Sequence, residues 1–532
     1  MTGFDWEFPY PSRRMPVLAA NVVATSQPLA AQAGLRMLLG GGNAVDAALA
    51  AAIALTVVEP TSNGLGSDAF ALVWDGRRLH GLNASGRSPA ALTPDRLAGR
   101  DAMPLRGWEP VTVPGAVSAW VQLSDRFGRL PFDALFEPAT RYAADGYPVA
   151  PVTAAAWSSA PKAFADRPAL LETFCPGGRA PGPGERFACP DLARTLARIA
   201  ETKGEAFYRG ELAEALARHA AETGGLITMD DLAAHRPDPV DPISVDYRGV
   251  TLHEIPPNGQ GLAALIALGI LGHHPVADLP VDSADSLHVQ IEAMKLAFAD
   301  AHRYIADPDH MDVSPADLLD PGYLAERASQ IDLGRAGRPT FGAPRDRDTV
   351  YLTAADADGM MVSFIQSNYW GFGSGIVVPG TGISLQNRGA GFSLEPGHPN
   401  RVGPRKRPYH TIIPAFVTRR REGAGAEPWI SFGVMGGPMQ PQGHVQVMVR
   451  IADYRQNPQA AVDAPRWQVE QDGGLMVEAA AGRAVIEELA RRGHRVRVAS
   501  PAAFGGAQLI CKLDAGYLAA SEPRKDGQAV GF

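Results

Sequence analysis

The sequence predicts an α+β protein made from one chain in two unequal parts. Up to about residue 306, apolar residues recur mostly at helical spacing, whereas the residues from 349 onward form short β-branched runs broken by glycine. Between the two parts, residues 307–348 are rich in Asp, Pro, Gly and Arg, which is typical of an exposed linker or processing loop. No repeat at a fixed period is present. We therefore expect one fold that is divided into two pieces.

The expected elements follow from local start and stop signals. A first helix begins after Ser26 and ends at Leu39 before three glycines, and Asn43 caps a second helix that runs from Ala44 to about Val58. A glycine-rich loop then leads to a strand. In order, the later elements are a strand over 69–74, helical spacing over 114–148 and 191–219, strand signals over 242–255, helices over 261–271 and 283–306, strands over 349–355 and 360–366, a helix near 442–454 and a final helix-strand tail.

Composition excludes several classes of protein. With 532 residues, 45% apolar and 20% charged, the chain is long enough to bury a large core and is not disordered or fibrous. A net charge of −8 with only short basic runs argues against a nucleic-acid partner. Residues 1–14 lack the apolar run of a secretory signal, and the longest apolar stretch, 44–58, is too short to span a bilayer. We expect no membrane partner.

Three cysteines, Cys175, Cys189 and Cys511, leave one thiol unpaired in any disulfide scheme. None of them lies at a metal-ligand spacing, so a reducing, cytoplasmic setting fits best. Cys175 and Cys189 flank a loop rich in Pro and Gly, and they would be the pair to form a disulfide in an oxidising compartment.

Thr349 stands where the charged linker meets a strand, and this position suggests a chemical role. A threonine hydroxyl is a poor nucleophile until a base takes its proton. Cleavage of the chain just before the residue supplies that base, because the new α-amino group has an ordinary pKa of about 7.7 to 8. One residue then serves as nucleophile and base together. The plain alternative is a β-branched residue that only opens a strand.

Other motifs carry weaker signals. Gly436 and Gly437 follow a strand-like run, and adjacent backbone N–H groups can converge on an oxyanion. The glycine-rich runs at 64–66 and 373–375 lack the spacing and lysine of nucleotide loops. We expect no cofactor and no metal. The alternative metal set is His302 and His310 with Asp300, Asp307 and Asp309, but the polar residues of the helix that ends near 306 are expected to face solvent.

Several longer segments, spread in order over nearly the whole chain, resemble the γ-glutamyltransferase family of N-terminal-nucleophile hydrolases. These segments are Gly41-Gly42-Asn43-Ala44-Val45-Asp46-Ala47-Ala48, Val58-Glu59-Pro60, Val113-Pro114-Gly115-Ala116-Val117, Ala206-Phe207-Tyr208-Arg209-Gly210, Gly225-Leu226-Ile227-Thr228 and Asn457-Pro458-Gln459-Ala460-Ala461-Val462-Asp463-Ala464-Pro465-Arg466.

The resemblance implies a four-layer αββα sandwich that is made as a precursor and cleaves itself before a threonine. The cleavage site is then Asp348-Thr349, and the products are a large subunit, 1–348, and a small subunit, 349–532, that begins with the nucleophile. Gly436 and Gly437 correspond to the family's oxyanion pair. The family usually has Thr-Thr-His at the nucleophile, whereas this chain has Thr349-Val350-Tyr351, so the second threonine is absent.

The acyl pocket departs from the family pattern. Gly391 stands where the family has an acid that holds the donor's ammonium, and Arg388 adds a cation in the same segment. Because a buried ammonium without a partner is unfavourable, these changes favour an acyl group that ends in a carboxylate and lacks the amine. The candidate substrate-binding residues are Arg87, displaced relative to the family's arginine, Ser367, Asn368, one position from the family's asparagine, Arg388, and His410 and Thr411, which replace a serine pair.

Three functions remain open at this point. The first is γ-glutamyl transfer or hydrolysis on glutathione-like donors, and the second is hydrolysis of an amine-free, glutaryl-like or oxamate-like amide. The third is a non-catalytic scaffold on an inherited fold. The expected partners are a small-molecule amide donor, water or an amine acceptor, the chain's own second fragment, and a second copy in a homo-oligomer.

Overall fold

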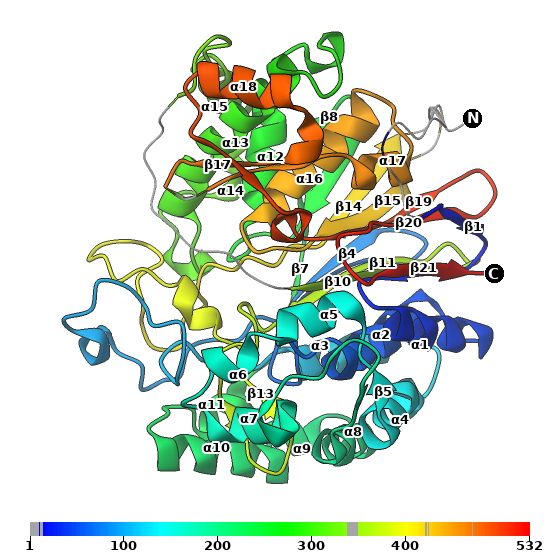
Figure 1. Ribbon diagram of the computed structural model, residues 1–532, viewed down its shortest axis with the longest axis vertical. Coiled ribbons are helices and arrows are strands. Elements are labelled where there is room, and N and C mark those ends of the chain that lie inside the picture. The colour runs from blue at the N-terminus through cyan, green and yellow to red at the C-terminus, as the bar shows by residue number, and fades with distance from the viewer. Residues whose placement is uncertain (1–9, 11–13, 338–348, 421–422, 424, 471) are drawn as a thin grey trace.

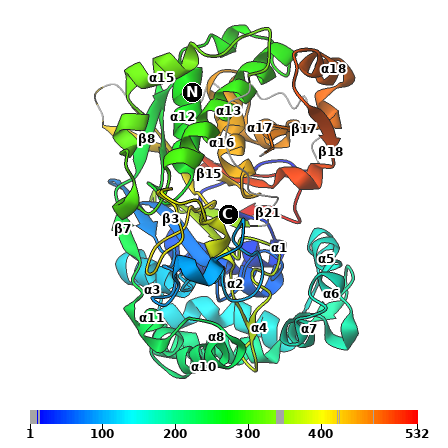
Figure 2. The ribbon, with the colours of Figure 1, turned by 90° about the vertical axis from the view of Figure 1, so that its left-hand side faces the viewer.

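Two seven-stranded sheets pack face to face, with helices on both outer faces (Figure 1). The computed structural model describes residues 10, 14–337, 349–420, 423, 425–470 and 472–532. Figure 2 shows the same layers from the side, with the green and orange helices on one face and the blue and cyan helices on the other. The predicted αββα sandwich is confirmed.

The first sheet joins strands from both sides of Thr349. Its neighbouring strands are all antiparallel. Their order is β21 (Gln528–Gly531), β2 (Val22–Thr25), β10 (Val350–Ala355), β11 (Met361–Ser367), β3 (Asp68–Trp74), β4 (Leu79–Asn83) and β7 (Asp238–Val240). Since β10 lies between β2 and β11, the strand that follows Thr349 is central to the sheet.

The second sheet is also antiparallel throughout. Its order is β1 (Val17–Ala19), β20 (Tyr517–Ser521), β19 (Ala507–Lys512), β15 (Ala426–Val434), β14 (Ala415–Arg420), β9 (Val250–Glu254) and β8 (Ile243–Tyr247). Strand β15 ends two residues before Gly436, so this sheet delivers the glycine pair.

A buried apolar layer fills the space between the sheets. Phe70 and Tyr351 of the first sheet lie in one cluster with Phe416 and Ile510 of the second. Side chains alternate across a strand, and Thr353 contacts Ser431 of the second sheet with 2.6 Å between the hydroxyl oxygens. Thr349 is in phase with Tyr351 and Thr353, so its side chain faces the space between the sheets.

The outer helices follow the predicted signals. Gln27 caps α1 (Pro28–Leu39), and Asn43 and Asp46 form a capping box at α2 (Ala44–Val58), in which every residue is buried. The apolar core on the side of the first sheet also includes residues of α3 (Ala116–Phe127), α4 (Glu137–Asp145), α8 (Pro190–Thr202) and α10 (Glu211–Thr223), and the core on the side of the second sheet includes residues of α12 (Gly261–Leu271), α13 (Ala284–Tyr304), α16 (Met439–Ala452) and α17 (Pro458–Asp463). Shorter elements are α5 (Pro151–Trp157), α6 (Ala160–Ala163), α7 (Pro168–Phe174), α9 (Glu205–Tyr208), α11 (Met229–Ala234), α18 (Arg483–Arg491), β5 (Tyr147–Pro148), β6 (Arg186–Phe187), β12 (Val377–Val378), β13 (Ile383–Ser384), β16 (Trp467–Val469), β17 (Leu475–Glu478) and β18 (Val496–Ala499).

The expectation of a structureless linker over 307–348 is wrong for its first half. Two helices form there, α14 (Pro315–Leu318) and α15 (Pro321–Ala328). Ser314 and Asp320 cap them, and Leu318 and Leu324 are buried in the core beside α12. Two short capped helices with few apolar anchors carry little periodic signal, so tertiary burial decides their formation.

Two further expectations concern compartment and membrane. Cys175, Cys189 and Cys511 are buried free thiols, so Cys175 and Cys189 do not form a disulfide here. Within the described residues, no helix combines the length and the apolar character that crossing a membrane requires.

Candidate active site

Thr349 is buried at the start of β10 and is surrounded by polar groups. Its hydroxyl oxygen lies 3.2 Å from the hydroxyl oxygen of Ser367, which ends the neighbouring strand β11. Ser367 in turn accepts a 2.7 Å hydrogen bond from the backbone N–H of Tyr369. The amide Nε2 of Gln440 lies 3.4 Å from the same Thr349 oxygen and donates to it. The structure therefore brings together Thr349 and Ser367, two of the candidate site residues, and adds Gln440.

Gln440 also connects Thr349 to the glycine pair, Gly436 and Gly437. The backbone N–H of Gln440 donates to the carbonyl of Gly437 at 3.1 Å, and its side-chain Oε1 accepts from the N–H of Ile413 at 2.9 Å. This second bond orients the amide so that Nε2 faces Thr349. Gln440 was not predicted, although its position in the first turn of the helix after Gly436 and Gly437 was a usable signal.

Gly436 and Gly437 have the backbone geometry of an anion site. Their φ angles are 111° and 56°, and a Cβ on Gly436 would lie 3.1 Å from the Cα of Gly505. Neither N–H group donates to another residue in the described part of the chain. Two uncommitted backbone donors are what stabilisation of a tetrahedral oxyanion requires, and Gln440 connects this glycine pair to the buried Thr349 hydroxyl.

Gln260 ties this glycine pair to the predicted pocket residues. Its Nε2 donates to the carbonyl of Gly437 at 2.8 Å and to the carbonyl of Thr411 at 2.6 Å. Gln260 therefore connects Thr411 to the glycine pair through hydrogen bonds. Gln260 lies at the start of α12, where the sequence carried no sign of a site.

Arg388 is fully buried beside Thr411. Its Nη1 donates to the hydroxyl of Thr411 at 2.7 Å, and its guanidinium carbon lies 4.1 Å from the centroid of the Tyr369 ring. Its Nε lies 3.7 Å from a carboxylate oxygen of Asp68. A planar cation held on an aromatic face is well suited to bind a carboxylate.

Asp68 is a buried carboxylate that sequence reasoning missed. It pairs in register with Ser367 across β3 and β11, and it accepts from Nε2 of His410 at 3.0 Å. The N–H of Ile412 donates to Nδ1 of His410 at 3.4 Å, so the ring proton is on Nε2. Burial raises the pKa of Asp68 to about 7 even though Arg388, the Gly86 N–H and Arg407 oppose this shift. Burial, together with Arg388 and Arg407, lowers the pKa of His410 well below its usual value, so His410 is neutral.

Asn368 and Arg87 are placed differently from the other predicted residues. Asn368 accepts from the hydroxyl of Ser67 at 2.9 Å and donates its backbone N–H to Ser62, so it holds the glycine-rich loop. Arg87 is 39% exposed, pairs with Asp307 at 2.7 Å and lines a separate cavity of about 250 Å³ with Arg405. No bond among the described residues links Arg87 to Thr349. Asp348, the other half of the predicted cleavage site, lies outside the described residues.

Gly391 packs so tightly that an acid cannot simply be restored there. A Cβ at this position would lie 2.4 Å from the carbonyl oxygen of Tyr409. We expect Gly391→Asp to lower stability by about 1 to 3 kcal/mol, the usual effect of overpacking, measured by thermal unfolding. Gly391→Ala should have a similar effect because the clash is at Cβ. An Asp variant as stable as wild type would contradict this packing.

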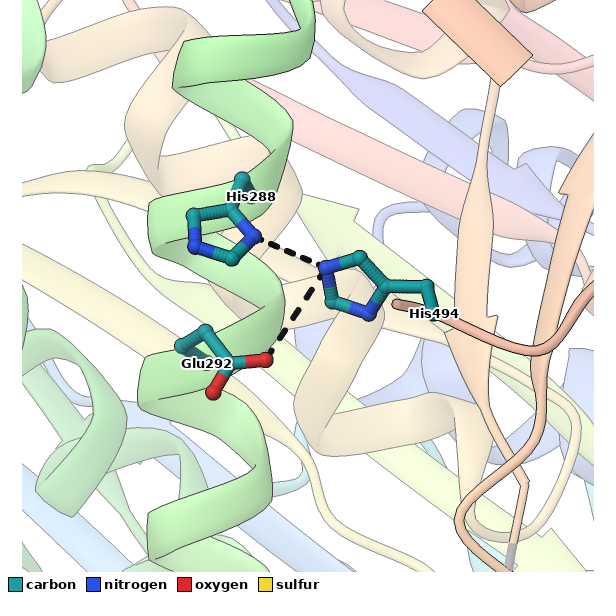
Figure 3. Close-up of side chains that lie close together, drawn as sticks. All are labelled: His288, Glu292 and His494. Carbon is teal, nitrogen blue, oxygen red and sulfur yellow. Dashed lines mark hydrogen bonds and ion pairs between the residues drawn. The ribbon is translucent and has the colours of Figure 1, made fainter. Parts of the chain in front are cut away.

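A second buried cluster, outside the predicted site, contains residues of the types that bind metal ions (Figure 3). His288 and Glu292 of α13 converge with His494, with ligand atoms within 4.8 Å of one another. However, the nitrogen atoms of the two histidines are 2.8 Å apart, which is a hydrogen bond. The Lys295 ammonium also contacts Glu292 at 2.7 Å and His494 at 3.2 Å. Lys295 therefore supplies the positive charge that a metal would bring, and we assign no metal here.

This cluster corrects one expectation about α13. Glu292 and Lys295 do not face solvent but are buried, because His494 and the backbone of Gly337 cover them. Two of the three acids of the alternative metal set are also engaged, Asp300 with Arg327 and Asp307 with Arg87.

Comparison with known proteins gives a consistent picture. The family model described as Gamma-glutamyltranspeptidase matches residues 30–532. The glutathione hydrolase-like YwrD proenzyme of Bacillus subtilis is 39% identical over 96% of this chain and 98% of its own length. The oxamate amidohydrolase proenzyme of Klebsiella pneumoniae is 39% identical over 95% and 97%. The crystal structure of cephalosporin acylase from Bacillus halodurans superposes with a TM-score of 0.93 and 51% identity, covering 99% of both chains.

Proposed function

Because this chain belongs to the γ-glutamyltranspeptidase family of hydrolases and transferases, we propose that it hydrolyses amides whose acyl group ends in a carboxylate and lacks an amine. Glutaryl-like and oxamate-like groups are the chemical classes that fit. The relatives named above are enzymes, two of them proenzymes, so the hypothesis of a non-catalytic scaffold is not favoured.

In this proposal the chain first cuts itself between Asp348 and Thr349, giving fragments 1–348 and 349–532. The freed α-amino group of Thr349 takes the proton of its own hydroxyl, and the hydroxyl oxygen attacks the amide carbonyl. The N–H groups of Gly436 and Gly437 hold the oxyanion while the amine leaves with a proton, and water then releases the acyl group. Gln440 and Ser367 orient the Thr349 hydroxyl. This chemistry requires no cofactor.

The observation that carries the donor assignment is the buried guanidinium of Arg388. It donates to Thr411, and Gln260 donates to the carbonyls of both Thr411 and Gly437, so this chain of hydrogen bonds supports a role for Arg388 near the proposed oxyanion pair. Gly391 supplies no acid opposite it. One relative is named for an amide of this kind, an oxamate amidohydrolase.

One observation favours γ-glutamyl hydrolysis as a second candidate. Asp68 is a buried acid in the same pocket, 3.7 Å from Arg388, and an ionised Asp68 offers a partner for a donor's ammonium. The glutathione hydrolase-like relative is consistent with such a donor. Comparing turnover of a glutaryl anilide with a γ-glutamyl anilide distinguishes the two candidates.

Arg388→Met should lower kcat/KM for a glutaryl anilide by about 10- to 100-fold, the range for one lost charge-assisted hydrogen bond. An uncharged butyryl anilide, measured in parallel, should change far less. Arg388→Lys keeps the charge but lacks the planar guanidinium, so its kcat/KM for the glutaryl anilide should lie between those of wild type and Arg388→Met. Equal losses for both anilides would mean that Arg388 supports the fold and does not bind the donor.

A cytoplasmic location is also part of the proposal. Three buried, unpaired thiols are compatible with a reducing compartment. Assembly into a homo-oligomer remains a prediction that gel filtration would test.

A further inference from the structure

Asp68 is a buried titratable group to which the proposed hydrolysis of carboxylate-ended amides gives no role. Its side chain is fully buried beside Arg388 and His410, and it faces the inter-sheet space in register with Ser367. It contacts neither the Thr349 hydroxyl nor the glycine pair in the described part of the chain. Its place is at the charged end of the acyl pocket and not at the reacting carbonyl.

The groups around Asp68 come from every element packed against it. The short helix at Arg388 and the segment before β14 bring two cations, Arg388 and Arg407, and the neutral His410. The loop after β4 brings the N–H of Gly86 at 3.3 Å. On the other side lies Tyr208 of α9, whose pKa is raised mainly by its own burial and in part by Asp68.

The neighbours of Asp68 and its burial have opposite effects on its pKa. The hydrogen-bonding contacts described above, from Gly86 and His410, both donate to the carboxyl oxygens, and both favour the ionised form. Burial disfavours that form, and the balance raises the pKa of Asp68 to about 7. Both forms of Asp68 are therefore populated near neutral pH.

Each form of Asp68 gives the pocket a different charge. When Asp68 is neutral, it does not offset the positive charge of Arg388, and the attraction for a donor's carboxylate is stronger. When Asp68 is ionised, it pairs with Arg388, and the attraction for a donor's carboxylate falls. An ionised Asp68 also gives an ammonium the counter-charge that Gly391 does not supply.

We propose that Asp68 is a specificity-determining residue whose protonation selects the charge of the acyl group: the neutral acid admits carboxylate-ended donors, and the carboxylate shifts the preference toward donors that also carry an ammonium. This inference rests on the proposed function, because it concerns the same acyl pocket.

The test is how the ratios of kcat/KM between donors of different charge change with pH. For the processed protein, kcat/KM is measured for glutaryl, butyryl and γ-glutamyl anilides from about pH 5.5 to 9. Ionisation of the Thr349 amino group affects all three donors and cancels in ratios. A group with a pKa near 7 passes from about 90% to about 10% protonated between pH 6 and 8, so the glutaryl-to-butyryl ratio should fall about ninefold. The γ-glutamyl-to-glutaryl ratio should rise.

Two variants identify the titrating group. Asp68→Asn keeps the shape and neutrality of the protonated acid, so its ratios should not change with pH. Glu59→Gln is the matched control, because Glu59 is another buried acid whose pKa burial raises to about 7, but it hydrogen-bonds Ser26 outside the pocket. The pH dependence of the ratios should survive in Glu59→Gln. Flat wild-type ratios, or unchanged pH dependence in Asp68→Asn, would overturn the inference.

Binding of glutarate separates this inference from the proposed function. If the processed protein turns over none of the anilides, the proposed function fails, and calorimetry with glutarate still tests Asp68. Affinity should then weaken about ninefold from pH 6 to 8 in wild type and stay constant in Asp68→Asn. Absence of glutarate binding at every pH, or the same pH dependence in both proteins, would refute the role of Asp68. Circular dichroism confirms that each variant is folded.

Discussion

Thr349→Ala is expected to remain a single chain of 56.3 kDa and to show no turnover of any amide donor. The side-chain oxygen that contacts Ser367 and Gln440 is lost, so neither self-cleavage nor acyl transfer has a nucleophile. Processing is followed over time on a denaturing gel. The small fragment of the wild type is then sequenced from its N-terminus, and it should begin at Thr349.

Thr349→Ser is the matched control. It keeps the hydroxyl but loses the methyl group that restricts χ1, so processing should continue more slowly. A wild-type small fragment that begins at any other residue would remove Thr349 from the mechanism. Processing of Thr349→Ala at the wild-type rate would do the same.

Gly436→Val should lower kcat by about 10² to 10³, the loss expected when one oxyanion donor is misplaced. The φ angle of Gly436 is 111°, which a β-branched residue does not adopt, and a Cβ would also press on Gly505. The backbone at Gly436 must therefore turn, and its N–H group would leave the place that the proposed oxyanion role requires. The value of kcat is measured with activity assays on the processed protein.

Gly437→Asn provides the comparison at the neighbouring position. Its φ angle of 56° lies in the left-handed region that Asn tolerates, so the N–H direction and kcat should be nearly preserved. If a folded, processed Gly436→Val keeps wild-type kcat, the glycines serve only as a turn before α16.

Local signals predicted much of the fold correctly. Asn43 predicted the start of α2 because its side chain caps that helix. The alternating residues after Thr349 predicted β10, whose odd positions face the second sheet. These features depend on neighbours in sequence, so a single chain segment carries the information.

The site residues that the sequence did not predict depend instead on contacts between segments far apart in the chain. Asp68, Gln440 and Gln260 lie 281, 91 and 89 residues from Thr349 along the chain, differences taken from their residue numbers. Each looks like an ordinary loop or helix-end polar residue until the two sheets pack. The burial of Lys295 was missed for the same reason, since His494 covers it from the far end of the chain.

The sequence by itself determined the α+β class, the order of the main elements and the family, and it singled out Thr349, the glycine pair and the unusual Arg388. Tertiary structure alone decided that Arg388 faces Asp68 and that Arg87 lies against Asp307. It also decided that Gly391 has no room for a side chain and that Asp68 has a raised pKa. The physical reason is that charge, burial and hydrogen bonding at a site depend on which distant segments close around it, and residue order does not encode those distances locally.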